Sequence, residues 1–470
     1  MLPQSSKKRN DKNHPLQLGP FRIDPIQKVH LECKLLVMKI LVIGGGGREH
    51  ALVWKLGQSQ EVTKVFCAPG NAGIAKLAEC IPIWPTDTEE LAAFSADRHI
   101  DLTVVGPEAA LCAGIANVFR ARGLPIFGPS RQAAQLEGSK VFSKRFLLKH
   151  GIPTADAEIF DDARSARQFV HTQGAPVVVK ADGLASGKGV TIARTVEEAD
   201  QAISDMIEKR IFGAAGAQIV VEECLSGEEA SVMALVDGKT VKLLAPAQDH
   251  KRALDGDCGP NTGGMGAYSP TPVADIGFRS DIHEIFLRTL AGLQAEGIEF
   301  RGVLYAGLMV TDGGPKVLEF NCRFGDPETQ VIVPRMDFDL VEAALAVTNG
   351  TLDRFELKWK REAAVCVVMA AGGYPGPYER GKVIEGLKEA SKLANVTVFH
   401  AGTRQTAEGQ IVTDGGRVLG VTALGENVED AVDRAYDAVK RIRFDGAHYR
   451  RDIAARALRL ASARTTQGRT

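Results

Sequence analysis

The chain has 470 residues, of which 44% are hydrophobic and 24% charged, values that suit a globular protein of roughly three domains at ~150 residues each. Its 57 basic and 58 acidic residues leave a net charge of −1, which favours neither nucleic acid nor an anionic membrane, although a basic pocket for a small anion needs only a few residues. The eight cysteines include no CxxC pair and no apolar run reaches 18 residues, which argues against zinc or thioredoxin-like chemistry and against a transmembrane helix, and fits a reducing compartment such as the cytoplasm.

The first 37 residues differ from the rest of the chain. They are polar, they show no apolar period, and no hydrophobic region with a small-residue cleavage site follows them. Met38 stands directly before the first clear strand. We therefore expect residues 1–37 to be a disordered extension rather than a targeting segment, because Asp11, Asp24 and Glu32 spoil the pattern of a transit peptide.

Residues 38–138 alternate between predicted strands and predicted helices. A strand over 39–43 runs into four glycines and then into a helix over 48–57, which is the opening of a doubly wound α/β unit. The same region holds predicted strands over 64–67, 102–105 and 125–127 and predicted helices over 89–97 and 113–122. This alternation predicts an N-terminal domain with a parallel sheet.

The pattern changes near Gln135, where a mixed region begins. It fits an α+β domain over 139–360, with predicted helices over 139–150, 163–172 and 196–209 and predicted strands over 176–180, 190–193, 218–222, 229–236, 240–245 and 317–320. A third, smaller α/β unit is predicted over 361–470, with strands over 363–370, 396–401 and 416–423, a helix over 428–441 and a last helix or tail over 452–463.

The segment 316–330 reads KVLEFNCRFGDPETQ and predicts a metal site. Strand side chains alternate between faces, so Glu319 and Asn321 should point to the same side. A carboxylate and an amide oxygen suit Mg²⁺, which takes few protein ligands and keeps waters and substrate phosphates. Arg323 and further acidic residues follow at once. A solvated loop after an edge strand is the alternative, and three other segments with phosphate- or substrate-binding character weigh against it.

Two glycine-rich segments are candidates for phosphate binding. Gly44–His50, GGGGREH, combines glycines with the start of a helix, although a tight structural turn is an equal alternative and dinucleotide binding is not compelled. In the segment 175–193, Lys180 ends a strand and Lys188 lies among glycines, so a mobile loop can close over phosphates. It is not a Walker A loop, because Gly189 follows Lys188 and a strand comes where that motif needs a helix. An exposed hairpin is the less favoured alternative.

Two further segments carry weaker signals. VVEE, over 220–223, is an apolar strand that ends in carboxylates and suits an adenosine. Residues 248–269 are predicted to be a long glycine-rich loop, whose charges of both signs suit a zwitterion together with a phosphate. A disordered surface loop is the alternative, against which Met265 and Tyr268 argue. His250 by itself is expected to be a hydrogen-bonded loop residue rather than a base.

The chain carries, in this order, the motifs GGREHAL, APGNAG, VGPE, QLEGSK, KADGLASGKGV, SGEEAS, QDHKR, GPNTGGMGAYSP, YAGLM, EFNCRFGDPETQ, MAAGGYPG and HAGT. The series resembles the phosphoribosylamine–glycine ligase family of the ATP-grasp superfamily, from Met38 to about Ala463. The resemblance implies a central ATP-grasp domain over 139–360, with a mobile lid subdomain over about 155–228. It also implies a reaction in which ATP phosphorylates glycine and the amine of 5-phosphoribosylamine attacks the glycyl phosphate, giving glycinamide ribonucleotide, ADP and phosphate for purine biosynthesis.

The resemblance further implies roles for single residues. Arg323, Lys188 and Asp249 would be catalytic, with Arg323 neutralising the transition state, and Glu319 and Asn321 would hold Mg²⁺ or Mn²⁺. ATP would contact Lys140, Lys180, Gly187, Lys188, Gly189, Glu222, Glu223, Leu225 and Glu229. The substrates glycine and phosphoribosylamine would be bordered by Gly46, Gly47, Arg48, Glu49, Gly70, Asn71, Pro107, Glu108, Asp249, Asn261, Gly263, Gly264 and Asp326.

A monomer that acts on small molecules, without nucleic acid or membrane, is expected. Other hypotheses stay open from the residues alone. One is an ATP-grasp ligase or carboxylase with another carboxylate or nucleophile. A second is a nucleotide-binding regulator without turnover, against which the Glu319 and Asn321 pair argues. A dehydrogenase would depend on the first glycine turn alone.

Overall fold

The computed structural model describes residues 37–184, 189–275 and 279–460. The described residues from Val37 onward belong to one compact unit. The extension predicted over 1–37 lies, apart from Val37, outside the described residues, as do Gly187 and Lys188 of the glycine loop. No helix within the described ranges is long and apolar enough to cross a membrane.

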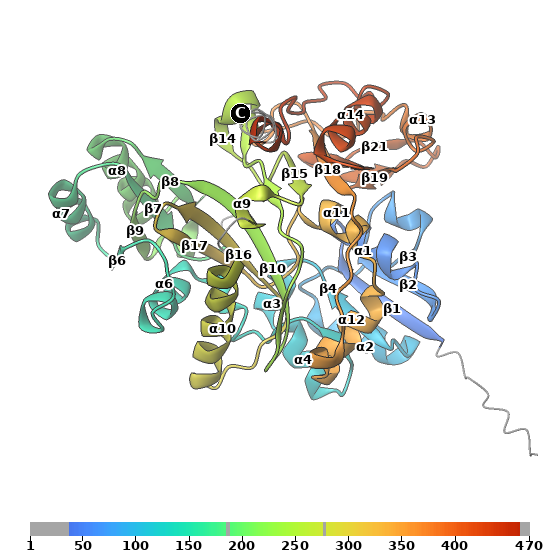
Figure 1. The fold of residues 1–470 in the computed structure, drawn as a ribbon, viewed down its shortest axis with the longest axis horizontal. Coiled ribbons are helices and arrows are strands. Elements are labelled where there is room, and N and C mark those ends of the chain that lie inside the picture. The colour runs from blue at the N-terminus through green and yellow to red at the C-terminus, as the bar shows by residue number, and fades with distance from the viewer. Residues whose placement is uncertain (1–36, 185–188, 276–278, 461–470) are drawn as a thin grey trace, which may run out of the picture. The chain divides into compact units, whose positions relative to one another are not determined.

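The N-terminal region forms a parallel sheet with strand order β3-β2-β1-β4-β5 (Figure 1). Its elements are β1 (Met38–Gly44), α1 (Gly47–Leu56), β2 (Val62–Pro69), β3 (Glu79–Cys80), α2 (Thr88–Arg98), β4 (Leu102–Val105), α3 (Glu108–Ala113), α4 (Ile115–Ala121) and β5 (Ile126–Phe127). Leu41 and Ile43 face one hydrophobic cluster while Ile40 and Val42 face another, as a parallel strand covered on both faces requires. The doubly wound fold is confirmed. The helix expected over 113–122 is confirmed as α4, which begins at Ile115 because Gly114 adopts φ +92° and separates it from α3.

The central region is built on an antiparallel sheet with order β11-β10-β16-β17. The long strand β16 pairs with β10 on one side and β17 on the other. Its elements are α5 (Gln135–Gly138), α6 (Lys140–Lys149), β10 (Glu228–Asp237), β11 (Val241–Leu243), α9 (Pro272–Asp275), α10 (Arg279–Ala295), β16 (Arg301–Thr311), β17 (Gly314–Asn321), α11 (Thr329–Ile332) and α12 (Leu340–Asn349). β16, α10 and α12 were not predicted from the sequence.

A second antiparallel sheet, with order β6-β9-β7-β8, carries its own core. It comprises β6 (Ala157–Phe160), α7 (Ala163–Gln173), β7 (Val177–Ala181), β8 (Val190–Ala193), α8 (Val196–Ile203) and β9 (Ile219–Glu223), and both helices pack on it (Figure 1). Val179, Ile203 and Val221 belong to a hydrophobic cluster that contains only residues of this sheet region. The helix predicted over 196–209 ends earlier, and a π turn over Ser204–Glu208 follows it.

The C-terminal region has a sheet of order β12-β15-β18-β22-β19. Its elements are β12 (Gln248–Asp249), β15 (Gly266–Ser269), β18 (Ala363–Ala370), α13 (Leu387–Ala390), β19 (Val396–His400), β20 (Thr403–Gln405), β21 (Ile411–Thr413), β22 (Arg417–Gly425) and α14 (Val428–Val439). The long loop expected over 248–269 is wrong, since this segment holds β12, β15 and a hairpin of β13 (Arg252–Leu254) and β14 (Cys258–Asn261). β15 is held by pairing with β18, a distant strand, and so leaves no local apolar period.

Candidate active site

The end of β17 presents Glu319 and Asn321. The β16–β17 pairing is irregular between Gly307 and Leu308, so that Gly307 lies opposite Glu319. A Cβ atom on Gly307 would stand 3.3 Å from Cγ of Glu319, so the glutamate packs over a glycine of the neighbouring strand. The Oδ1 atom of Asn321 accepts a hydrogen bond from Arg323, at 3.0 Å. The predicted metal pair therefore lies where the strand leaves the sheet, as expected.

Cationic side chains from separate elements surround Glu319. Partial burial acts to raise the pKa of Glu319, but Lys251, Lys180, Lys140 and Arg323 stabilise the carboxylate and bring its pKa below the ordinary value. Lys251 Nζ lies 3.8 Å from Glu319 Oε1 and 3.1 Å from Glu229 Oε2. The ammonium and guanidinium groups of these four side chains are the kind of charged donors that bind the oxygens of a polyphosphate ligand.

Glu222 is a buried counter-ion for two lysines. Its carboxylate lies 2.7 Å from Lys180 Nζ and 3.2 Å from Lys144 Nζ, and all three side chains are at most one-tenth exposed. Lys180 Nζ also donates to the carbonyl of Leu318, at 3.0 Å. This hydrogen bond joins the two antiparallel sheets near the C-terminal end of β17. Glu223, on the opposite face of β9, is exposed and pairs with Lys316 at 2.8 Å.

Three further predicted ATP residues fall within the described residues: Lys140, Gly189 and Leu225. Lys140 Nζ donates to the Gly183 carbonyl at 3.0 Å, and burial lowers the pKa of this lysine while Glu319 partly offsets the effect. Gly189 accepts a hydrogen bond from the backbone of Ala181 at the start of the glycine loop. Leu225 is half-buried in the connection after β9.

Arg323 lies between two carboxylates from the N-terminal side. Its guanidinium is 2.7 Å from Glu137 Oε1 and 3.2 Å from Glu108 Oε2. Burial raises the pKa of Glu137 to about 7 although Arg323 opposes the rise, whereas for Glu108 the opposing effect of burial is overcome by Arg323 and Arg48, which bring its pKa to about 2. Glu137 also accepts from the backbone N–H of Cys322 at 2.7 Å. The sequence analysis missed Glu137, although it stands in the QLEGSK motif.

The other side of Lys251 is acidic. Burial raises the pKa of Asp249 to about 8; Lys251 opposes the rise, and Glu328, Glu229 and Glu319 add to it. Glu328 is buried, and its Oε1 accepts from Tyr305 at 2.6 Å and from Ser231 at 3.0 Å. The site therefore has cationic side chains around Glu319 and, beside Lys251, a carboxyl group, that of Asp249, which keeps its proton near neutral pH.

The first glycine turn lies beside the loop that follows β17. Glu49 caps its own helix by accepting from the Gly46 N–H at 2.6 Å, and Arg48 donates to Glu49 at 2.6 Å and to the Phe324 carbonyl at 3.2 Å. A Cβ atom on Gly46 would lie 3.6 Å from Asp326 Oδ2. Gly47 comes close to Gln330, Gly70 bonds to the Gly44 carbonyl, and Pro107 stands at the start of α3. The structure thus brings these predicted substrate residues together.

Asn71 is used by the protein itself. Its amide nitrogen donates to the carbonyls of Gly45 and His400, both at 2.8 Å. Its oxygen accepts from the N–H groups of Gly73 and Ile74, at 2.9 and 3.0 Å. The four hydrogen bonds satisfy the whole side chain. We therefore interpret Asn71 as a residue that holds the glycine turn against the C-terminal region, in place of the predicted contact with substrate.

Arg417 of β22 completes the site from the C-terminal region. Its guanidinium lies 3.1 Å from Asp326 Oδ2, donates to the Asp326 carbonyl at 2.8 Å, and contacts the carbonyls of Gly263 and Gly264. Asn261, by contrast, pairs with Arg252 in the β13–β14 hairpin. No local sequence signal marks Arg417, because an arginine on a strand that alternates with apolar residues usually faces solvent.

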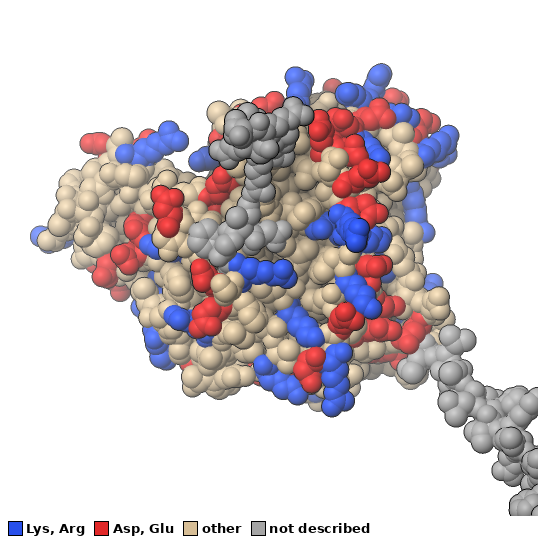
Figure 2. Space-filling view, viewed as in Figure 1, with Lys and Arg blue, Asp and Glu red and all other residues tan. Residues whose placement is uncertain are grey.

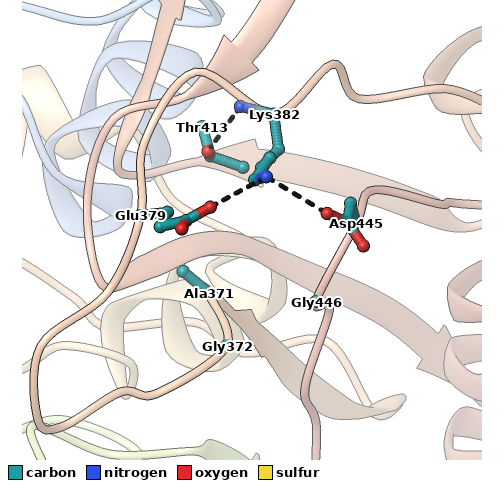
Figure 3. Close-up of a pocket in the computed structure, with 7 residues that line it drawn as sticks. All are labelled: Ala371, Gly372, Glu379, Lys382, Thr413, Asp445 and Gly446. Carbon is teal, nitrogen blue, oxygen red and sulfur yellow. Dashed lines mark hydrogen bonds and ion pairs between the residues drawn. The ribbon is translucent and has the colours of Figure 1, made fainter.

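The charge on one face and one hollow of the C-terminal region were compared with the site at the end of β17. Lysine and arginine are interspersed with aspartate and glutamate over the face shown in Figure 2. Figure 3 shows a small hollow in the C-terminal region, in which Lys382 lies 2.8 Å from Glu379 and 3.1 Å from Asp445. The lysine charge is already matched there, and the residues that line the hollow include none of the predicted site residues.

The residues at the end of β17 fit a divalent cation. Among the described residues, no three histidine, cysteine or acidic side chains gather as a metal-binding group. Glu319 and Asn321 instead offer one carboxylate and one amide oxygen, a donor set for a hard cation that keeps waters and phosphate oxygens as further ligands.

Two antiparallel sheets that meet at a group of lysines, with a carboxylate–amide pair beside them, define an ATP-grasp protein. Three family models match the chain: the N domain, the ATP-grasp (A) domain and the C domain of phosphoribosylglycinamide synthetase, over residues 38–137, 138–329 and 364–456. The chain therefore belongs to the phosphoribosylglycinamide synthetase family, also called phosphoribosylamine–glycine ligase.

Individual relatives agree with this assignment. Phosphoribosylamine–glycine ligases of Nostoc sp. and Vibrio vulnificus are 52% and 53% identical to the chain, covering 88% and 90% of it and 99% of each relative. The crystal structure of the Thermotoga maritima enzyme has 37% identity and a TM-score of 0.78, covering 89% of this chain and all of that one. The biotin carboxylase of Campylobacter jejuni, at 15% identity and a TM-score of 0.67 over 87% of this chain and 92% of that one, shares the fold.

Proposed function

We propose that this chain ligates glycine to 5-phosphoribosylamine at the expense of ATP, giving glycinamide ribonucleotide, ADP and phosphate in de novo purine biosynthesis. The observation that carries the proposal is the gathering of Lys140, Lys180, Lys251 and Arg323 around Glu319. Family membership over 38–456 supports the choice of substrates.

On the nucleotide side, the chain supplies charge and position. Lys140 and Lys180 bind the phosphates of ATP, and Glu319 with Asn321 would hold Mg²⁺ or Mn²⁺. A bound divalent cation neutralises charge on the phosphate oxygens during transfer. Arg323 approaches the same oxygens once a ligand competes with its carboxylate partners. Most of the rate then comes from positioning and electrostatic stabilisation.

On the acceptor side, the carboxyl groups beside Lys251, those of Asp249, Glu229 and Glu328, bind the amino groups of the substrates. In the first step a glycine carboxylate oxygen attacks the terminal phosphorus and ADP leaves. In the second step the ribosyl amine forms the C–N bond, phosphate departs with the electrons of the C–O bond, and the amine loses a proton. Asp249, whose pKa is raised by burial to about 8, exchanges a proton near neutrality and lies beside Lys251, so we assign this proton transfer to it.

The test is release of ADP with defined substrates. Full-length protein is given ATP, Mg²⁺ and fresh phosphoribosylamine with glycine, alanine or bicarbonate, and the product made from labelled glycine is weighed by mass spectrometry. We expect ADP release that needs both glycine and the amine, and a product that carries the label. Equal ADP release with bicarbonate or alanine would assign the chain to another ATP-grasp reaction.

Several expectations stay predictions. These are the domain limits at 138 and 360, the lid over about 155–228, the choice between Mg²⁺ and Mn²⁺, the monomeric state and the cytoplasmic location. The roles of Lys188 and Gly187 also stay predictions, since both lie outside the described residues.

A further inference from the structure

A short C-terminal segment, residues 448–456, grips the β13–β14 hairpin. His448 Nε2 lies 2.8 Å from the Ala253 carbonyl, the Arg451 N–H donates to Asp255 at 2.7 Å, and Asp452 accepts from the Gly256 N–H at 2.9 Å. Arg456 forms an ion pair with Asp257 of the hairpin. We call this set of contacts the C-terminal clasp. None of these residues belongs to the machinery proposed above.

Arg450 is the centre of the clasp. Its side chain is 1% exposed and is the largest fully buried side chain among the described residues. It makes two bonds to Asp452, both at 2.7 Å, and one to Asp257, at 2.8 Å. It also donates to the backbone carbonyl of Arg252, at 3.2 Å. A fully buried guanidinium is costly unless its donors are satisfied, so the site is built around this geometry.

The clasp brackets Lys251 on both sides along the chain. Arg450 bonds to Arg252, the next residue, and the Ala454 N–H donates to His250 Nε2, the preceding residue, at 3.2 Å. The Lys251 carbonyl itself accepts from Thr262 on the returning strand, at 2.7 Å. The backbone of Lys251 is thereby fixed on either side, while its ammonium reaches Glu229 and Glu319.

Backbone strain marks both halves of the clasp. Ala454 and Asp257 adopt left-handed conformations, at φ 66° and 55°. Such conformations are unfavourable for a non-glycine residue and persist where surrounding contacts over-determine the backbone. The Ala454 conformation aims its N–H at His250, and the Asp257 conformation turns the hairpin so that its carboxylate meets Arg450 and Arg456.

We propose that Arg450 is a positioning residue, which acts through the C-terminal clasp to set the location of Lys251 and the adjoining hairpin in the active site. The inference depends on the proposed function for its kinetic readout. It gives the C-terminal region a part in turnover, because Arg450, which lies outside the proposed site, holds in place Lys251, which lies beside Glu319. A displacement of about 1 Å at a reacting group can cost as much as a hundredfold in rate, so small errors in the hairpin matter.

The test separates positioning from stability. Arg450→Met alone would leave two carboxylates without their partner, so the main variant combines Arg450→Met with Asp257→Asn and Asp452→Asn. Replacing a whole buried ion cluster by neutral groups is often neutral for folding. We expect thermal unfolding close to that of the wild type, and a fall of about tenfold in kcat. Arg450→Lys keeps the charge and loses the forked geometry of the guanidinium. Its kcat should lie between those of the wild type and the triple variant.

A second readout needs no activity. Trypsin cleaves after Lys251 and Arg252, and we expect these bonds to be cut about tenfold faster in the folded triple variant than in the wild type, because the clasp no longer holds them. Should the triple variant not fold, Asp257→Asn serves alone, since Asp452 still pairs with Arg450; it should lower kcat and speed the same cleavage. Arg441→Gln, which removes an exposed pair with Asp437 in the same region, should change neither.

The outcomes distinguish this inference from the proposed function. If the wild type makes glycinamide ribonucleotide and the folded variants match it in kcat and in cleavage, the clasp has no positioning role. If the wild type makes no product, the proposed function fails, while faster cleavage in the variants would still support the clasp. Faster cleavage with unchanged kcat in an active protein would overturn the link between the hairpin and turnover.

Discussion

Glu319 draws its low pKa from cations that reach it from four parts of the chain. Glu319→Gln should therefore lower kcat by about 100-fold or more, because the amide can neither carry the charge for a divalent cation nor balance the lysines. ADP release at saturating ATP measures this. Glu356→Gln, at an exposed pair with Lys358, is the matched control. Equal turnover in the two variants would contradict the assignment of Glu319.

His50 offers a test of burial at the scale of one residue. Burial, His400 and Lys76 lower the pKa of His50 to about 3, and its Nδ1 accepts from the His400 N–H at 2.7 Å. The unfolded chain takes up a proton below about pH 6.5, whereas the folded chain does not, so the stability due to neutral His50 is present above that pH and lost as pH falls.

His50→Gln should thus be less stable than the wild type by about 1–2 kcal/mol at pH 7, for the lost hydrogen bond. Between pH 7 and pH 5 this gap should shrink by about 2 kcal/mol, because only the wild type incurs the protonation penalty. Urea unfolding at both pH values measures the gap. A gap that stays constant would show that His50 titrates normally in the folded chain, and one that widens in acid would show that its pKa is raised; either result would contradict the lowered pKa.

The positions of single residues were predictable where a local rule applies. The alternation of a strand places Glu319 and Asn321 at one end of β17, and the glycine turn lies beside them. Glu137 and Arg417 were not predicted, because their partners Arg323 and Asp326 are distant in sequence. Arg450 was not predicted either: beside its near neighbour Asp452 it needs the distant Asp257. A buried charge is recognised by its partners, and a single sequence does not show them.

At the scale of the element, β9 shows how two adjacent glutamates differ. Glu222→Gln removes the charge between Lys144 and Lys180, which are both buried, and should cost about 3–5 kcal/mol of unfolding free energy. Glu223→Gln breaks an exposed pair with Lys316 and should cost about 1 kcal/mol or less. Chemical denaturation of the two variants measures the difference. Similar losses would mean that the buried triad does not stabilise the sheet junction.

Helices and strands were predictable where characteristic residues mark their ends. β4, β8 and β18 lie at the predicted residues, because short apolar runs are bounded there by glycine, proline or charged residues. β16 was missed although it is long and central, and the strands within 248–269 were hidden by glycines. Their strand character comes from pairing with β10, β17 and β18, which a local pattern does not contain.

At the scale of the whole molecule, Asn71 and His400 connect the glycine turn to the C-terminal region. Asn71→Ala removes four hydrogen bonds and leaves backbone groups of both regions unsatisfied, so it should destabilise the protein by about 2–4 kcal/mol. Thermal unfolding of the full-length variant measures this. Asn117→Ala, which removes one exposed bond to the Arg131 N–H, should cost under about 1 kcal/mol. Equal costs would contradict the structural role given to Asn71.

The central claim is that the cations around Glu319 activate the carboxylate of glycine as an acyl phosphate. Glycine labelled with ¹⁸O in its carboxylate, incubated with the protein, ATP and phosphoribosylamine, tests this most directly. Transfer through glycyl phosphate moves one carboxylate oxygen to phosphorus, so mass spectrometry should find one ¹⁸O atom in each phosphate released. Unlabelled phosphate, released together with labelled product, would contradict the account.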